Sequence, residues 1–220
     1  MLKLKISHGD KKMKGFDSIN TNSLTNDFCN KMKKNCNMVC NKCYSNQFLS
    51  YRKNAKIAYQ KNTDILANNI LEFKDIDYIN SKYFRFHSFG ELINFTHLKN
   101  FITIAEKNKH VSFGLWTKRK DIINKYHDLI PDNIILIYSN PYLNKPILKV
   151  PDNFDKVFNV ITIEYMLEKC IKVNCFKACI NCLNCYKKSN KLDNNIVIEL
   201  LKKDKPKYNK LKGIFNYDNL

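Results

Sequence analysis

The sequence of 220 residues contains few residues that break a regular chain and few acidic ones. It has five glycines, five prolines and one tryptophan, and only 20 aspartates and glutamates against 38 lysines and arginines. No apolar run approaches the roughly 20 residues that a membrane-spanning helix needs. Residues 1–6 alternate polar and apolar side chains and contain no long apolar stretch, which is unlike a secretory signal. We therefore expect a cytoplasmic protein without a membrane segment.

The formal net charge of +18 has two interpretations. It can serve a polyanionic partner, such as nucleic acid or a nucleotide substrate, for which the Lys/Arg clusters at residues 118–120 and 202–207 are the places to look. Alternatively, the abundance of Lys, Asn and Ile is typical of an AT-rich coding sequence, and the lysines form an ordinary solvated surface. No recognised nucleic-acid-binding motif accompanies the charge.

Nine cysteines without a secretory signal indicate metal binding in a reducing compartment rather than disulfides. Cys36, Cys40 and Cys43 have the spacing C-x3-C-x2-C, and an aromatic residue, Tyr44, follows them. Thiolates select zinc or iron–sulfur centres, and three of them leave one coordination position open. Cys29 precedes this group and is a spare ligand, a redox-active thiol or a small buried residue.

A second group places five cysteines within sixteen residues near the C-terminus. Four of them have the spacings x3, x2 and x2, which suit a tetrahedral zinc or a [4Fe-4S] cluster: Cys175, Cys179, Cys182 and Cys185. A fully ligated site of this kind is structural or conducts electrons. One of the five, counting Cys170, is left over, and the spacing alone does not decide which.

Hydrophobic periodicity predicts strands alternating with helices. We expect strands at residues 2–6, 18–21, 83–87, 111–116, 134–138 and 157–161, and helices at 94–107 and 119–127. Residues 47–73 are expected to form two helices, with a break near residues 62–64 and a cap at Thr63 or Asp64. Such βαβ units require a parallel sheet. We predict an α/β fold whose sheet is parallel and resembles a partial (β/α) barrel, an open sheet being the alternative, with a cysteine-rich C-terminal segment.

The same pattern divides the chain into three parts. Residues 1–165 form the α/β core, residues 166–190 the cysteine-rich segment, and residues 191–220 a basic extension. Polar residues follow three predicted strands, at residues 87–91, 117–119 and 139–141. The carboxyl ends of parallel strands share one edge of a sheet, and the first cysteine loop lies between a predicted strand and a helix. We expect all four segments to meet at this edge.

The cysteine loop resembles a known family signature. Cys36-x3-Cys40-x2-Cys43 followed by Tyr44 is similar to the motif of radical S-adenosylmethionine (SAM) enzymes, whose three cysteines bind a [4Fe-4S] cluster with SAM on its fourth iron. Gly90 and Glu91 resemble the end of the Gly-Gly-Glu motif that holds the SAM amino group, although Phe89 replaces the first glycine.

More narrowly, the order of features is similar to that of the small radical-SAM-like phage proteins of the gene product eighty-eight family. The shared features are Cys43-Tyr44, the segment Arg85-x-His87-x-x-Gly90-Glu91, Thr117-Lys118 and the terminal cysteine group. They cover roughly residues 16–190 in order, which is more specific than the first three cysteines alone.

The resemblance implies a radical SAM enzyme that cleaves SAM reductively and starts hydrogen abstraction from a substrate. It implies a cluster on the first three cysteines, an auxiliary cluster on the second group, and a flavodoxin-like or ferredoxin-like electron donor. It also implies a location in the host cytoplasm if the protein is phage-encoded. The implied cofactor-binding residues are Tyr44, His87, Ser88, Gly90, Glu91, Thr117 and Lys118; no catalytic residue is assigned.

Two alternatives stay open. In the first, both cysteine groups are structural zinc knots of a nucleic-acid-binding protein, and Cys29 completes the first site. In the second, the chain is a non-catalytic iron–sulfur module for binding or electron transfer.

Overall fold

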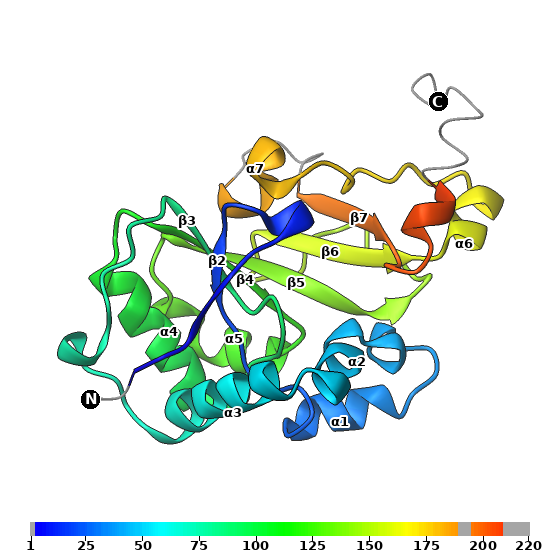
Figure 1. Ribbon diagram of the computed structural model, residues 1–220. Helices are drawn as coiled ribbons and strands as arrows, with labels where there is room; N and C mark the ends of the chain where they lie inside the picture. The colour runs from blue at the N-terminus through cyan, green and yellow to red at the C-terminus, as the bar shows by residue number, and fades with distance from the viewer. Residues whose placement is uncertain (1–2, 189–194, 209–220) are drawn as a thin grey trace.

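The computed structural model describes residues 3–188 and 195–208, which form one sheet with helices around it (Figure 1). Seven strands lie in sequence order across the sheet. β1 pairs antiparallel with β2, and every later neighbour is parallel. The strands are β1 (Ile6–His8), β2 (Asp17–Ile19), β3 (Tyr83–Phe86), β4 (Ser112–Thr117), β5 (Ile134–Leu143), β6 (Lys156–Ile161) and β7 (Ile196–Leu200).

The mixed α/β class and the mostly parallel sheet are confirmed, but the sheet does not close into a barrel. Within the described residues, β1 pairs only with β2 and β7 only with β6, so the first and last strands are edges. At one edge of the sheet, the hairpin places β1 antiparallel to β2, whereas a (β/α) barrel would have a parallel strand at this position.

Helices α3, α4 and α5 cover one face of the sheet, while α1 and α2 lie beyond the ends of its strands (Figure 1). The α-helices are α1 (Asp27–Lys33), α2 (Tyr44–Tyr51), α3 (Lys53–Asn68), α4 (Phe95–Lys107), α5 (Lys120–Tyr126), α6 (Ile163–Glu168) and α7 (Cys179–Cys182). The 3-10 turns are η1 (Lys11–Met13), η2 (Val39–Lys42), η3 (Phe73–Asp75), η4 (His127–Leu129) and η5 (Asn184–Tyr186). None of the described helices is long and apolar enough to cross a membrane.

The main core lies between the sheet and helices α3 to α5. Alternate residues of a strand face the same side, and in β3 the fully buried Phe84 and Phe86 point to the helices. Leu98 and Phe101 of helix α4 pack in the same core. Asn94 is the N-cap of this helix. A smaller core between β6, β7 and α6 contains Ile161, Ile163, Met166, Val173, Ile198 and Leu200.

Several predicted boundaries are wrong. The helix break falls at Arg52 instead of residues 62–64, and Asn62 and Thr63 are buried inside α3. Their polar side chains have partners there: Asn62 donates to the carbonyls of Lys5 and Asn20, and Thr63 accepts from the backbone N–H of Asn22. Of the strand predicted at residues 2–6, residue 2 lies outside the described residues, and β1 begins only at Ile6. Strand β5 continues to Leu143, five residues beyond its predicted end.

The face of the sheet opposite α3 to α5 is covered by the cysteine-rich segment. Ser112 of β4 donates to the carbonyl of Tyr186 over 2.5 Å. A Cβ at Gly114 would lie only 3.1 Å from the carbonyl oxygen of Cys185 and 2.6 Å from Trp116, so the glycine permits this close approach. The apolar run at residues 196–200, assigned to the basic extension, lies in the sheet as β7.

Candidate metal and cofactor site

The first cysteine loop lies at the carboxyl end of β5. The N–H of Leu143 donates to the carbonyl of Asn37 over 3.0 Å, and Met38 forms an isolated antiparallel bridge with Tyr142. Cys40 then falls in η2, and Cys43 immediately precedes α2. The extension of β5 thus supports the loop through backbone contacts just before the second and third cysteines.

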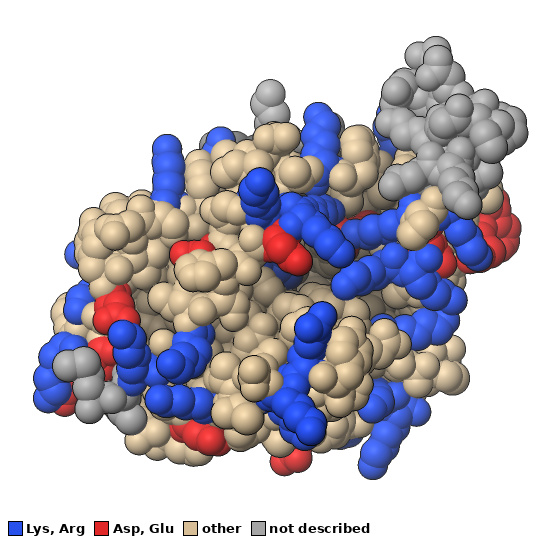
Figure 2. Space-filling view, in the orientation of Figure 1, with Lys and Arg blue, Asp and Glu red and all other residues tan. Residues whose placement is uncertain are grey.

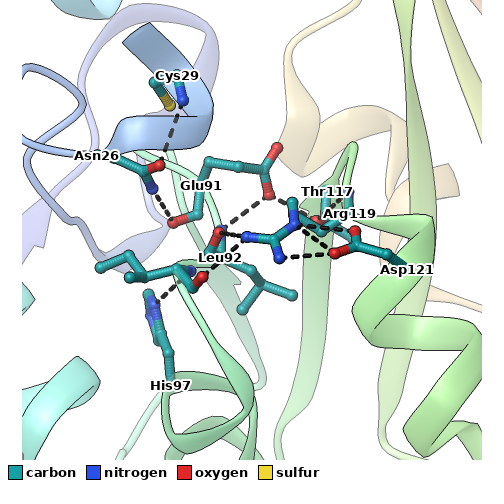
Figure 3. Close-up of polar contacts among 9 residues, drawn as sticks. Asn26, Cys29, Glu91, Leu92, His97, Thr117, Arg119 and Asp121 are labelled. Atoms are coloured by element: carbon teal, nitrogen blue, oxygen red, sulfur yellow. Dashed lines mark hydrogen bonds and ion pairs between the residues drawn. The ribbon is translucent and has the colours of Figure 1, made fainter. Parts of the chain in front are cut away.

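Glu91 lies at the same edge of the sheet, and its buried carboxylate accepts three hydrogen bonds. Oε1 accepts from the hydroxyl of Thr117 over 2.5 Å and from the N–H of Leu92 over 2.9 Å (Figure 3). Oε2 accepts from the N–H of Lys118 over 2.9 Å. A buried carboxylate is stable only with such partners. Glu91 therefore ties the loop after β3 to the loop after β4.

Asn26 extends this network to helix α1 (Figure 3). Its Oδ1 caps the helix by accepting from the N–H of Cys29 over 3.2 Å, and its Nδ2 donates to the carbonyl of Glu91 over 3.1 Å. Arg119 supports the other side, since its guanidinium donates to the carbonyls of Leu92 and Ile93 and pairs with Asp121.

Lys118 belongs to the Glu91 network and lies near the cysteine loop. Its Nζ donates to the hydroxyl of Ser139 in β5 over 3.0 Å. Burial lowers the pKa of Lys118, but the thiol of Cys40 and the carboxylate of Glu91 outweigh that effect and raise the pKa above its ordinary value. Lys118 is therefore a fixed positive charge close to both groups.

Two thiols near Lys118, those of Cys40 and Cys29, have raised pKa values. Burial raises the pKa of Cys40, and Lys118 opposes this increase. Burial also raises the pKa of Cys29, with Glu91 and then Cys40 adding to the effect. Cys36 is exposed. A metal bound by Cys40 would therefore displace a proton from its thiol, and Lys118 favours the thiolate form.

The remaining predicted cofactor residues take different positions. The hydroxyl of Tyr44 donates to the carbonyl of Ser88 over 2.6 Å, which joins the start of α2 to the loop after β3. His87 adopts a left-handed backbone, with φ of 65°, and its ring is buried against His97 and Phe101. The imidazole of His87 thus faces the core, and only the backbone around it borders the site.

Gly90 is required by the path of this loop. Its φ is 107°, which side-chain-bearing residues rarely adopt. A Cβ at this position would also overlap with the side chain and backbone of Thr21. The backbone conformation and the lack of space therefore explain why glycine precedes Glu91, without reference to any ligand.

The C-terminal cysteine group lies among basic side chains. Lys12 donates to Sγ of Cys175 over 3.1 Å. Burial and then Glu199 raise the pKa of Cys175 to about 11, against the opposing effect of Lys12. Burial and then Cys175 raise the pKa of Cys185 to about 12, against the opposing effect of Arg85. Arg85 stacks on Trp116 at 3.9 Å from the ring centroid, and its charge acts on Cys179, Cys185 and also Tyr44. Arg85 therefore lies near the C-terminal cysteine group and near Tyr44, the residue after Cys43.

No set of three or more His, Cys, Asp or Glu side chains within residues 3–188 and 195–208 is arranged to hold a single metal ion. The ligands of a four-iron cluster lie farther apart than those of a single metal ion. The number and type of ligands therefore decide whether these residues suit a cluster. The first loop offers three thiols and the second group four, each beside a cation that favours thiolate.

Sequence reasoning missed several residues that build this site. Asn20 is fully buried and accepts the N–H groups of both Ser88 and Phe89 at Oδ1, over 2.8 and 2.9 Å. It follows β2 directly, but the predicted strand at residues 18–21 includes it, so the strand-end argument did not point to it. Lys12 carried no such signal, because its partners are distant in sequence. Arg85 was named only as part of the segment shared with the family.

Basic side chains are unevenly placed on the surface. Figure 2 shows Lys and Arg gathered around a hollow over the region between β7 and α2. Lys202 follows β7 closely and places its ammonium group 4.9 Å from the centroid of the Tyr44 ring. The surface next to the cysteine loop is therefore positively charged.

Comparisons with curated proteins and with solved structures found no match. A family model described as Gene product 88 matches residues 3–207, which is nearly the whole chain. The match includes both cysteine groups and the Glu91 network. The chain therefore belongs to the Gene product 88 family.

Proposed function

We propose that this protein is a radical SAM iron–sulfur enzyme that cleaves SAM reductively and starts hydrogen abstraction from a substrate. The observation that carries the proposal is the meeting of the three-cysteine loop and Glu91 at the carboxyl edge of a parallel sheet, with Lys118 near both. Functional groups of parallel α/β folds gather at this edge. When bound, a [4Fe-4S] cluster would supply the electron that cleaves the sulfonium of SAM.

The chain's own residues have distinct tasks in this proposal. Cys36, Cys40 and Cys43 hold the first cluster and leave one iron for SAM. Oε2 of Glu91 accepts a single backbone N–H from Lys118, which leaves it capacity for an amino group. The backbone around Ser88 and Gly90 and the ring of Tyr44 border the same space, and Lys118 contributes a positive charge for a carboxylate.

Two further parts of the proposal concern partners. Cys175, Cys179, Cys182 and Cys185 hold an auxiliary cluster, and a flavodoxin-like or ferredoxin-like protein supplies electrons in the cytoplasm of a phage-infected host. The basic hollow in Figure 2 supports an anionic substrate such as a nucleotide or nucleic acid.

The test is anaerobic purification followed by an absorption spectrum, an iron and sulfide count, and an assay for 5′-deoxyadenosine with SAM and dithionite. Cys40→Ala is expected to lose the first cluster and all SAM cleavage. The matched control is Cys170→Ala, since Cys170 is exposed and outside both motifs. SAM cleavage that persists in Cys40→Ala would contradict the proposal.

One observation favours a second candidate, a zinc protein that binds nucleic acid. Helix α1 packs against η2, and Cys29 shares its electrostatic environment with Cys40 and Cys43. A fourth thiol from Cys29 would close a structural zinc site. Zinc in place of iron, lost in Cys29→Ala as well as in Cys40→Ala, would support this candidate and exclude SAM chemistry at the loop.

A further inference from the structure

Lys12 lies in η1, between β1 and β2, yet its ammonium group contacts the C-terminal cysteine segment. Nζ donates to Sγ of Cys175 over 3.1 Å, to the carbonyl oxygen of Cys175 over 2.9 Å and to Oε1 of Glu199 over 2.6 Å. An ammonium group has three N–H donors, and here there is one acceptor for each. All three N–H groups of the Lys12 ammonium therefore have an acceptor in Cys175 or Glu199.

Glu199 holds Lys12 in place and forms ion pairs with two lysines, Lys12 and Lys205. Its Oε1 also accepts from Lys205 over 2.7 Å, so two ammonium groups share one carboxylate and leave a net positive charge beside Cys175. The side chains of Lys12 and Glu199 are only 28% and 20% exposed, which limits screening by solvent. Burial lowers the pKa of Lys12, but Glu199 and Cys175 together outweigh burial and raise the pKa above its ordinary value, so Lys12 stays charged.

The backbone of Cys175 is held by β7 as well as by Lys12. Its N–H donates to the carbonyl of Ile198 in β7 over 3.1 Å, and the preceding Asn174 exchanges side-chain hydrogen bonds with β7. β7 therefore fixes the position of the cysteine, while the ammonium group that donates to its sulfur comes from the N-terminal hairpin.

We infer that Lys12 is a positioning residue that raises the reduction potential of a metal centre ligated by Cys175, through its positive charge and its N–H···S hydrogen bond. A cation and a hydrogen bond beside a ligand sulfur both stabilise the reduced cluster, which carries one more electron. Glu199 and Lys205 position Lys12 and set the net charge. This inference rests on the auxiliary centre of the proposed function.

The experiment uses the full chain with Cys40→Ala, so that the remaining iron belongs to the C-terminal centre. The one-electron midpoint potential is measured by titration with dithionite and electron paramagnetic resonance. Lys12→Met is expected to disfavour reduction about tenfold, equivalent to a fall of about 59 mV. Lys12→Arg should stay near the parent value, and Lys12→Gln should fall between them. The matched control is Lys14→Met, an exposed lysine at the end of the same turn.

A structural role alone predicts a different result. If Lys12 merely clamps the hairpin to β7, Lys12→Met will lower the melting temperature without changing the potential, which would overturn the inference. Zinc or no metal in the Cys40→Ala chain would overturn it too, while leaving SAM cleavage by the unmodified protein unaffected. Conversely, absence of SAM cleavage with the potential shift intact would refute the proposed reaction and support the role of Lys12.

Discussion

The hydroxyl of Thr117 donates to Oε1 of Glu91 over 2.5 Å, and this bond joins the carboxyl ends of two neighbouring parallel strands. Both residues are buried, so the carboxylate has no water to replace a lost donor. The bond is thus part of the frame that holds the candidate site, whatever ligand the site takes.

Thr117→Val is expected to lower the free energy of unfolding by about 2 kcal/mol, because it removes a donor to a buried charge while keeping the shape of the side chain. Urea denaturation measures this loss. Thr103→Val is the control, since the hydroxyl of Thr103 bonds only within α4 near the surface, and its loss should be within about 0.5 kcal/mol. Equal effects of the two substitutions would contradict a special role for the Thr117 bond.

Gly90→Ala is expected to destabilise the protein more than Gly15→Ala. Both glycines have positive φ, at 107° and 87°, so both substitutions carry the strain of a left-handed residue, about 1–2 kcal/mol. Only at Gly90 does the added Cβ also meet Thr21, whereas nothing lies within 4 Å of it at Gly15. The difference in unfolding free energy between the two variants isolates the steric part; no difference would show that the loop moves freely away from Thr21.

Glu91→Ala is expected to weaken SAM binding while the iron content stays unchanged, because Glu91 is near the cysteine loop but is not a thiolate ligand. Equilibrium binding of SAM to the anaerobic protein measures the affinity. Asp121→Ala is the comparison, because Asp121 pairs with Arg119 at the exposed rim of the same network. Unaltered affinity in Glu91→Ala would remove Glu91 from the cofactor site.

Cys182→Ala is expected to lose about half of the bound iron, since it removes one of two four-iron centres, while some SAM binding remains. Iron and sulfide analysis of the anaerobic protein provides the measurement. Cys170→Ala should retain all of the iron. A full iron content in Cys182→Ala would argue against an auxiliary cluster.

The buried His97 predicts acid sensitivity. Burial lowers its pKa to about 3, far below the unfolded value near 6.5. The unfolded chain therefore binds a proton that the folded chain refuses, so stability is present above about pH 6.5 and falls by about 1.4 kcal/mol per pH unit as pH decreases toward 3. Urea denaturation at pH 7 and pH 5 measures how steeply the unfolding free energy falls. His97→Gln should remove the contribution of one proton, about 1.4 kcal/mol per pH unit, from that slope. An unchanged slope would mean that His97 is not the group responsible.

The sequence predicted the site's location better than its details. Strand ends at residues 87–91 and 117–119 were visible because β3 and β4 are short apolar runs followed by polar residues, and Glu91 and Thr117 do meet there. Helix α3 was misread because Thr63 and Asp64 resemble a cap, although Thr63 and the preceding Asn62 find buried partners across the fold. Lys12 was beyond prediction, because it reaches Cys175 only after the sheet has brought the two ends of the chain together.

The attachment of the cysteine loop to β5 bears on how such a protein matures. Leu143 and Tyr142 hold Asn37 and Met38 through backbone contacts that involve no sulfur. The backbone path of the loop therefore comes from the polypeptide itself. On the proposed function, the chain would fold first and a cluster would be inserted afterwards.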